Sequence, residues 1–335
     1  VAVLVDTDDA KWPTTVTPTE PAPTVATAQA SWRTVFTGAS GVDAFYREMS
    51  GGRLGLTLVT GGVLGPVHLG GKWADWHQMN GTLWEIKDDM LQRIATALQG
   101  TPGLTWTDVD AIFVIVRSAS STNFTWPFAK SRQVTIKVKS GCKDVDHKVA
   151  RVCMPHDQTS TVKFTDVAVS AHELGHTFGL DDQYMPATDP NFTDAMRTRE
   201  LGQRELMAHE DNLPHLAARH KLLLGFLDPG QVRTFTLGVP ESNQIVDLVP
   251  VSSGLPPAGR MSAIELRVAP GLSWFFELRQ PVPGLLGDLH VPTFGTGQVI
   301  GYDAIKYRNP PVVADKRKPI IMLIDDGDGE GAALT

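Results

Sequence analysis

One segment in the middle of the chain has the residue types and spacing of a metal site. His172 and His176 are one helical turn apart, so both imidazoles project from the same helix face and can hold one Zn²⁺. Glu173 lies about 100° round that helix, where its carboxylate can hold the water that completes the zinc shell. Gly179 suits a left-handed helix end, and the resulting turn can bring Asp182 back as a third ligand. The pattern predicts metal-assisted hydrolysis of an amide, with Glu173 moving the proton.

The identity of the third ligand has alternatives. Three protein ligands and one open position are typical of a catalytic zinc site, whereas a structural site uses four protein ligands. With only two cysteines in the chain, a thiolate-rich structural site is disfavoured. Asp181 is the nearest alternative to Asp182. In thermolysin-like enzymes the third ligand is a glutamate from a later helix, and three are available: Glu200, Glu205 and Glu210. The spacing from Gly179 favours Asp182.

The two histidines must be positioned by an amphipathic helix. A narrow apolar stripe lies on the side away from the histidines, at Val167, Ala171, Leu174 and Phe178. The back of the helix is therefore expected to pack into the core while its front faces a cleft. Thr165 or Asp166 can cap the start of the helix. Downstream, His209 and His215 are expected at the surface or in the cleft wall.

The zinc motif resembles that of the metzincin metallopeptidases, with Asp182 in place of the usual third histidine. Metzincins carry a methionine turn beneath the metal, and Met207, in the segment 205–209, is similar to it. The resemblance implies a mixed twisted sheet with an active-site helix. It also implies an edge strand that pairs with extended substrate, for which residues 134–138 are the candidate. The alternative there is a solvated strand whose lysines protect the edge against aggregation.

Further segments are similar to the immune inhibitor A group of secreted bacterial peptidases: residues 45–54, 179–184, 220–227 and 275–281. The resemblance spans about residues 40–300, and it implies a secreted zinc endopeptidase acting on protein or peptide substrates. The group often has Glu immediately before the tyrosine, where this chain has Gln183. Tyr184 can steady a developing oxyanion, or it can be a half-buried packing residue. Outside enzymology, the alternative is a catalytically silent binding or adhesion module that keeps a zinc site.

The hydrophobic patterns predict an α+β fold in two parts. A zinc peptidase domain is expected over residues 1–228, and an antiparallel β-rich subdomain, packed on it or appended to it, over residues 229–335. A Pro/Thr/Ala-rich loop is expected over residues 12–28. Helices are expected at residues 40–50, 83–98 and 214–224. Strands are expected at residues 1–5, 54–59, 67–69, 109–117, 134–139, 232–237, 245–251, 262–268 and 273–278.

Composition excludes several classes of protein. The chain has 335 residues, of which 42% are hydrophobic and 20% charged, as in ordinary globular proteins. Its net charge of −7 gives no electrostatic case for nucleic acid as a partner. No apolar run approaches the roughly 20 residues of a membrane span. Because the chain begins with Val1 and shows no leader, we expect a processed form from which any propeptide is removed or absent.

Two smaller features bear on stability and cofactors. Cys142 and Cys153 enclose a short loop, and beside a secreted fold they are expected to form a disulfide rather than two free thiols. Acids at positions 326, 328 and 330 are spaced like the start of a calcium loop. The twelfth-position glutamate of such a loop would lie beyond Thr335, so a solvated acidic turn is favoured over a Ca²⁺ site.

Overall fold

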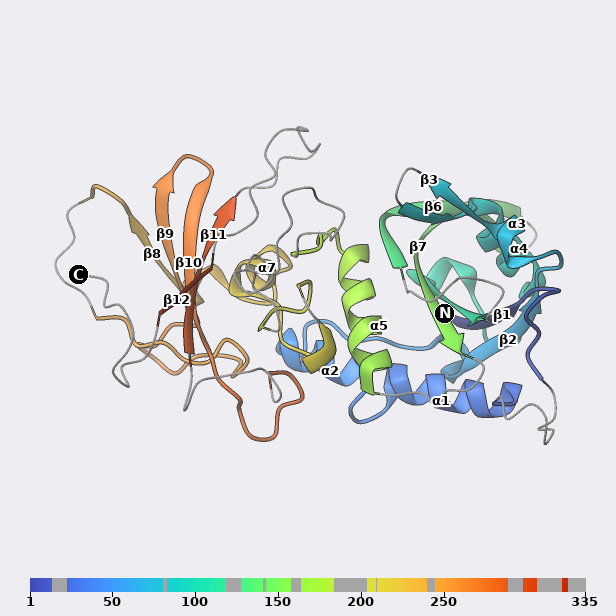
Figure 1. The fold of residues 1–335 in the computed structure, drawn as a ribbon, viewed down its shortest axis with the longest axis horizontal. Coiled ribbons are helices and arrows are strands. Elements are labelled where there is room, and N and C mark those ends of the chain that lie inside the picture. The colour runs from blue at the N-terminus through green and yellow to red at the C-terminus, as the bar shows by residue number, and fades with distance from the viewer. Residues whose placement is uncertain are drawn as a thin grey trace. The chain divides into compact units, whose positions relative to one another are not determined.

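The computed structural model describes residues 1–13, 23–80, 83–118, 128–140, 143–157, 164–183, 204–208, 210–239, 245–288, 298–305 and 321–324 (Figure 1). The chain divides into two compact units. Unit 1 contains Val1–Asp43 and Leu56–Leu180, and unit 2 contains Ala44–Gly55 and Asp181–Thr335. The predicted boundary at residues 228 and 229 lies inside unit 2, because Ala208, Ala217 and Leu227 share one buried core with the C-terminal strands.

Unit 1 is built on a five-stranded mixed sheet with the strand order β2-β1-β5-β7-β6. Strands β1, β2, β5 and β7 run parallel, and β6 is antiparallel to β7 at one edge. The strands are β1 (Ala2–Asp6), β2 (Val63–His68), β5 (Ala111–Ser118), β6 (Phe128–Ser140) and β7 (Lys143–Asp157). A separate hairpin is formed by β3 (His77–Asn80) and β4 (Leu83–Ile86).

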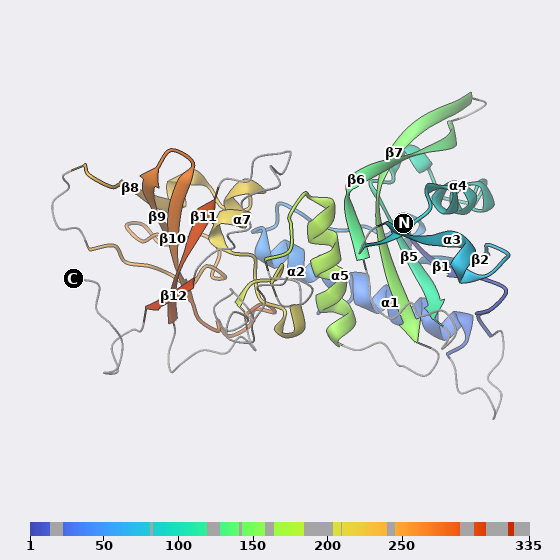
Figure 2. The same ribbon diagram turned by 45° about the horizontal axis from the view of Figure 1, so that its top comes forward.

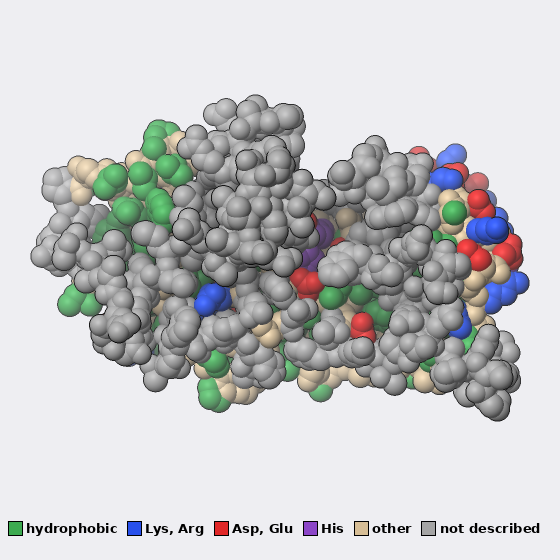
Figure 3. All heavy atoms as spheres, viewed as in Figure 1, with side chains coloured by type: hydrophobic (Ala, Val, Ile, Leu, Met, Phe, Trp, Pro, Cys, Tyr) green, Lys and Arg blue, Asp and Glu red, His purple; other side chains and the backbone are tan. Residues whose placement is uncertain are grey.

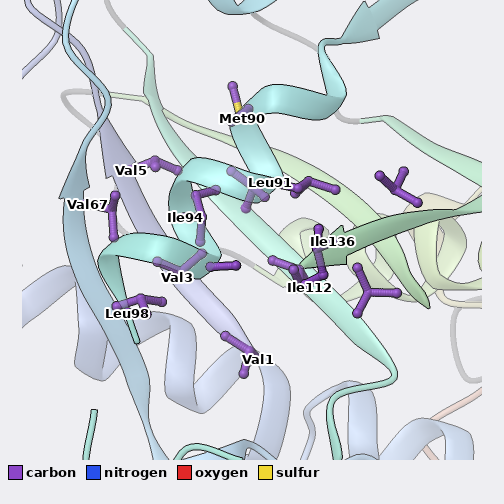
Figure 4. Packing of buried hydrophobic residues seen from close by; sticks show 14 of the residues in the cluster. Val1, Val3, Val5, Val67, Met90, Leu91, Ile94, Leu98, Ile112 and Ile136 are labelled. Atoms are coloured by element: carbon purple, nitrogen blue, oxygen red, sulfur yellow. The ribbon is translucent and has the colours of Figure 1, made fainter. Parts of the chain in front are cut away.

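Both faces of this sheet are covered, which explains why β1 is buried along its whole length. On one face lies α4 (Asp88–Ala97), whose Leu91 and Ile94 pack in a cluster with Val3 and Ile112 (Figure 4). On the other face lies α1 (Val25–Thr37), whose Phe36 ring is 4.7 Å from the ring of Phe113. Helix α5 (Phe164–Thr177) packs against β6 and β7 (Figure 2).

The sequence-based prediction for unit 1 was wrong at three places. Helix α1 occupies part of the predicted loop over residues 12–28, and Thr24 caps its start by accepting a hydrogen bond from the Thr27 amide. The predicted helix 83–98 is a strand followed by the shorter helix α4, because Asp88 and Asp89 mark the true first turn. Residues 54–58 form no strand, and β2 pairs with β1 instead.

Unit 2 contains a second five-stranded sheet, with the order β12-β11-β10-β9-β8. Its strands are β8 (Val232–Thr236), β9 (Ala263–Ala269), β10 (Leu272–Arg279), β11 (Gln298–Ile305) and β12 (Ile321–Ile324). Helix α7 (Ala218–Leu223) belongs to this unit, whereas α3 (Trp73–Trp76) belongs to unit 1 and α2 (Val42–Met49) straddles the unit boundary. Short 3₁₀ turns occur at Val59–Gly61, Trp106–Asp108, Glu210–Asn212 and Pro229–Gln231.

The C-terminal sheet differs from the predicted antiparallel module in one respect. Strand β8 runs parallel to β9, whereas the other pairings are antiparallel, so this sheet is also mixed. The parallel pairing is possible because residues 237–262 are long enough to carry the chain back to the starting end. The predicted strand 245–251 makes only isolated bridges at Leu248 and Pro250. Helix α7 is shorter than the predicted 214–224.

The structure is therefore mixed α+β, with a mixed sheet in each unit. On the visible face of unit 1, basic and acidic side chains are intermixed at the right of Figure 3, as the near-balanced composition predicts. Within the described residues, no helix has both the length and the apolar character that crossing a bilayer requires. The acids at 326–330 lie outside the described residues, so the calcium prediction stays a prediction.

Candidate metal centre

Helix α5 has the predicted amphipathic organisation. Val167, Ala171 and Leu174 are buried in the core, as the apolar stripe predicts. Phe178 is the exception, with 37% of its surface exposed, because the helix ends at Thr177 and the next residue leaves the stripe. The helix begins at Phe164, so Asp166 lies inside its first turn rather than at the cap. An acid there still favours the positive end of the helix dipole.

The chain reverses sharply after α5, as the glycine predicts. Gly179 has φ of 86°, the left-handed conformation that glycine adopts without a steric penalty. The Gly179 amide donates to the His176 carbonyl at 2.9 Å, and the Leu180 amide donates to the Gly175 carbonyl at 3.3 Å. These bonds close the helix end and turn the following residues back along it.

The turn brings three potential ligands together. One ligand atom from each of His172, His176 and Asp182 lies within 4.8 Å of the other two. The imidazole rings are 4.9 Å apart and nearly perpendicular. Nδ1 of His176 lies 2.8 Å from the Leu180 carbonyl, and a carbonyl oxygen only accepts, so Nδ1 carries the proton. That bond leaves Nε2 as the nitrogen with a lone pair for a metal, the usual arrangement of a ligating histidine. The donor set could therefore hold a divalent metal ion.

Glu173 is held inside unit 1 at the same helix. Its side chain is only 5% exposed, which removes it from bulk water. On β7, burial raises the pKa of the Cys153 thiol, and the negative charge of Glu173 raises it further. Arg151 opposes both effects in part. The Cys153 thiol is therefore protonated and chemically inert.

Met207 lies in a turn, as the resemblance to a methionine turn implies, and is fully buried. Its carbonyl accepts a hydrogen bond of 2.7 Å from the amide of Gln183, the residue after Asp182. The Gln183 side chain donates to the Asp181 carbonyl at 3.0 Å. The segment with the third candidate ligand is thus hydrogen-bonded to the turn that contains Met207. Tyr184 and His209 lie outside the described residues.

Glu205, a rival third ligand, is engaged elsewhere. It is fully buried, and both of its carboxylate oxygens accept hydrogen bonds within unit 2. Glu210 lies in the turn Glu210–Asn212, and Glu200 lies outside the described residues. Among the residues the structure describes, the group that could hold a metal contains none of these glutamates.

His215 was predicted to lie at the surface or in the cleft wall. This prediction is wrong, because the residue is fully buried. Its Nε2 lies 2.8 Å from Oε1 of Glu48, and its Nδ1 lies 2.9 Å from Nζ of Lys221. The backbone of Gly287 approaches so closely that an added Cβ would lie 1.9 Å from the imidazole, so only glycine fits there. His215 belongs to a group that we call the buried charge network: Glu48, His215, Lys221, Glu277, Arg279 and Asp288.

The buried charge network was not predicted from sequence. Arg279 pairs with Glu277 at 2.6 Å and with Asp288 at 3.1 Å, and all three side chains are fully buried. Burial, and then the charges of Lys221 and Arg279, holds the pKa of His215 well below its usual range. Burial also lowers the pKa of Lys221 to about 7. The only local signal was the run of alternate polar residues along β10, at Glu277 and Arg279.

The predicted disulfide between Cys142 and Cys153 is wrong. Cys153 is a buried free thiol, and Cys142 itself lies outside the described residues. Cys153 lies inside strand β7, which runs without interruption from Lys143 to Asp157.

No protein-family model, curated protein or solved structure matches this chain. The chemistry assigned to the site rests on the geometry of its own residues.

Proposed function

We propose that this chain is a secreted zinc-dependent endopeptidase of the metzincin type. The observation that carries the proposal is the convergence of His172, His176 and Asp182, with ligand atoms within 4.8 Å of one another. Three ligands from one helix and its turn match a catalytic site, which keeps a fourth position open. The use of both oxygens of Glu205 within unit 2 argues against a thermolysin-like arrangement with that residue as ligand.

Each residue has a separate task in the proposed reaction. Bound zinc would act as a Lewis acid and lower the pKa of a coordinated water to about 7. Glu173 would accept a proton from the water that attacks the peptide carbonyl. The same carboxyl group would then give this proton to the leaving amine as the C–N bond breaks. Glu173 would therefore carry one proton from the water to the amine. The hydrogen bond from His176 to Leu180 fixes the imidazole while this happens.

An extended peptide is the substrate that the sheet of unit 1 can accommodate. Strand β6 is one of the two edge strands of this sheet, as predicted for residues 134–138, and α5 packs against it. Its Val134, Ile136 and Val138 are buried, so a peptide would add through main-chain hydrogen bonds at the edge. At Lys137 the edge is already occupied, because the Gln92 side chain binds both the amide, at 2.7 Å, and the carbonyl, at 3.0 Å. Strand addition would therefore use the part of β6 before Lys137.

The test compares Glu173→Gln with the wild type, measuring cleavage of casein and of a broad peptide library together with zinc content. We expect the variant to keep zinc and to lose activity by roughly 10²–10⁴-fold, because the general base is removed. Glu210→Gln is the matched control and should keep both zinc and activity.

Two other outcomes contradict the proposal. Loss of zinc in Glu210→Gln would favour a thermolysin-like ligand set. A wild type that binds zinc and cleaves nothing in the library would favour a silent binding module.

A further inference from the structure

Glu205 is a fully buried carboxylate with three hydrogen-bond donors. Its Oε2 accepts a short hydrogen bond from the backbone amide of Met207. Its Oε1 accepts from the Ala217 amide at 3.3 Å and from Nδ1 of His220 at 2.9 Å. A charged acceptor with two amide donors makes strong, directional bonds inside a protein. Glu205 therefore fixes the methionine turn to the start of α7.

The same turn reaches the segment of the third ligand through one further bond. The Met207 carbonyl accepts a hydrogen bond of 2.7 Å from the Gln183 amide. The Met207 amide, at the other end of the residue's backbone, donates to Glu205. Gln183 is buried, and its side chain also holds the Asp181 carbonyl. The residues on both sides of Asp182 are therefore held by hydrogen bonds: Gln183 by the Met207 carbonyl, and Asp181 by the Gln183 side chain. The path from Glu205 to Asp182 contains only two hydrogen bonds, and every group on it lies in unit 2.

We propose that Glu205 is a positioning residue of the metal centre, acting through Met207 and Gln183 on the carboxylate of Asp182. The role rests on the proposed function, since it requires that Asp182 bind zinc. A ligand displaced by a fraction of an ångström binds its metal more weakly, because ligand distances vary by only about 0.2 Å in good sites. Replacing the Glu205 carboxylate releases the Met207 amide, and with it the anchor of Gln183. Zinc affinity, rather than the chemistry of Glu173, is the property that Glu205 controls.

The experiment uses Glu205→Gln, with zinc affinity measured by chelator competition and the ligand field measured from the visible spectrum of the Co²⁺-loaded protein. An amide nitrogen accepts no hydrogen bond, so in the place of Oε2 it leaves only the Met207 amide without an acceptor. In the place of Oε1 it would leave two donors, Ala217 and His220, without one, so the placement at Oε2 is the less costly. We expect zinc affinity to fall by about 10–100-fold, as for other outer partners of ligands, and the cobalt spectrum to change.

Glu277→Gln is the matched control. Glu277 is also fully buried in unit 2, where it accepts from the Ala218 amide at 2.6 Å and from the Tyr302 hydroxyl at 2.8 Å. Neither bond involves Met207 or Gln183. This variant is expected to lose thermal stability while keeping wild-type zinc affinity and the wild-type cobalt spectrum.

If Glu205→Gln keeps the wild-type zinc affinity and the wild-type cobalt spectrum, the positioning role is overturned and the proposed function is not. A wild type that binds no zinc overturns the proposed function and this role with it. Should Glu205→Gln fail to fold, Glu205→Asp keeps the charge beside His220 but withdraws the carboxylate from Met207 by one methylene. That variant should also bind zinc more weakly, and wild-type affinity in it overturns the role.

Discussion

The metal-centre segment and the buried charge network contain the same residue types in different arrangements. In the segment 172–182, two imidazoles and a carboxylate converge on one point. In the network, each carboxylate faces donors of its own: Asp288 accepts from the His215 amide at 2.8 Å and from Arg279 at 3.1 Å. Glu48 likewise accepts from the amides of Leu286 and Gly287.

The difference distinguishes a site that can bind a metal ion from a cluster that stabilises the fold. Ligand atoms that converge on one point can share a single cation. Lone pairs that are satisfied by amides and a guanidinium are already used, and the charges of Glu277 and Asp288 are compensated by Arg279. A histidine with carboxylates nearby is therefore informative only when the direction of each donor and acceptor is known.

The largest expected effect concerns the metal-centre segment. Asp182→Ala should reduce zinc affinity by more than about 100-fold, which exceeds the loss expected when a residue that only contacts a ligand is replaced. The variant should also lose zinc-dependent peptide cleavage. Asp181→Ala, the neighbouring acid, should behave as the wild type. Zinc content by atomic absorption and affinity by chelator competition provide the measurement. Retention of zinc by Asp182→Ala would place the third ligand elsewhere.

The second prediction concerns the network. Arg279→Met should lower the free energy of unfolding by about 3–5 kcal/mol, because it leaves buried carboxylates without their charge partner. Arg267→Met is the control: Arg267 pairs with Glu265 at 3.1 Å but is 59% exposed, so its loss should cost no more than about 1 kcal/mol. Urea denaturation of both variants measures the difference. Equal small losses would mean that the network contributes nothing to stability.

The smallest expected effect is a pH dependence. Burial, and then the charge of Arg279, lowers the pKa of Lys221 to about 7 in the folded chain, against an ordinary value of 10.5, while Asp288, Glu277 and Glu48 oppose the shift. Between these values the unfolded chain binds a proton that the folded chain does not, so stability rises with pH. The rise amounts to about 2–3 kcal/mol between pH 7 and pH 9.

Lys221→Met should abolish this rise, and no slope from Lys221 is expected below pH 7, where both states are protonated. Urea denaturation of the wild type and Lys221→Met at a series of pH values measures the difference. Parallel stability curves for the two proteins would contradict the lowered pKa.

The parts of the structure that could be predicted from sequence are those with local causes. The histidine pair and Gly179 act within a helix and its turn, and the structure brings His172, His176 and Asp182 together as the spacing predicts. The edge position of β6 was also predicted correctly. Helix α1 was missed although Ala28, Trp32 and Phe36 carry a helical spacing, because the Thr- and Pro-rich composition suggested a loop.

The remaining features depend on partners far away in the chain. His215 is buried because Glu48, 167 residues earlier, meets it, and no local pattern reports such a pairing. The disulfide prediction failed because sequence spacing does not reveal that Cys153 is a free thiol buried within a long extended strand. Glu205 was considered only as a ligand, since its contact with the Met207 amide depends on the conformation of the turn.

The membership of Ala44–Gly55 in unit 2 has a consequence for the order of folding during synthesis. All residues of unit 1 have left the ribosome once Leu180 has emerged, so that unit can close early. Glu48 is made before most of unit 1, yet its amide donors Leu286 and Gly287 are among the later residues to be translated. His215 is translated 167 codons after Glu48, and the two amides follow more than two hundred codons after it, so the Glu48 carboxylate stays hydrated until late in the synthesis of the second unit.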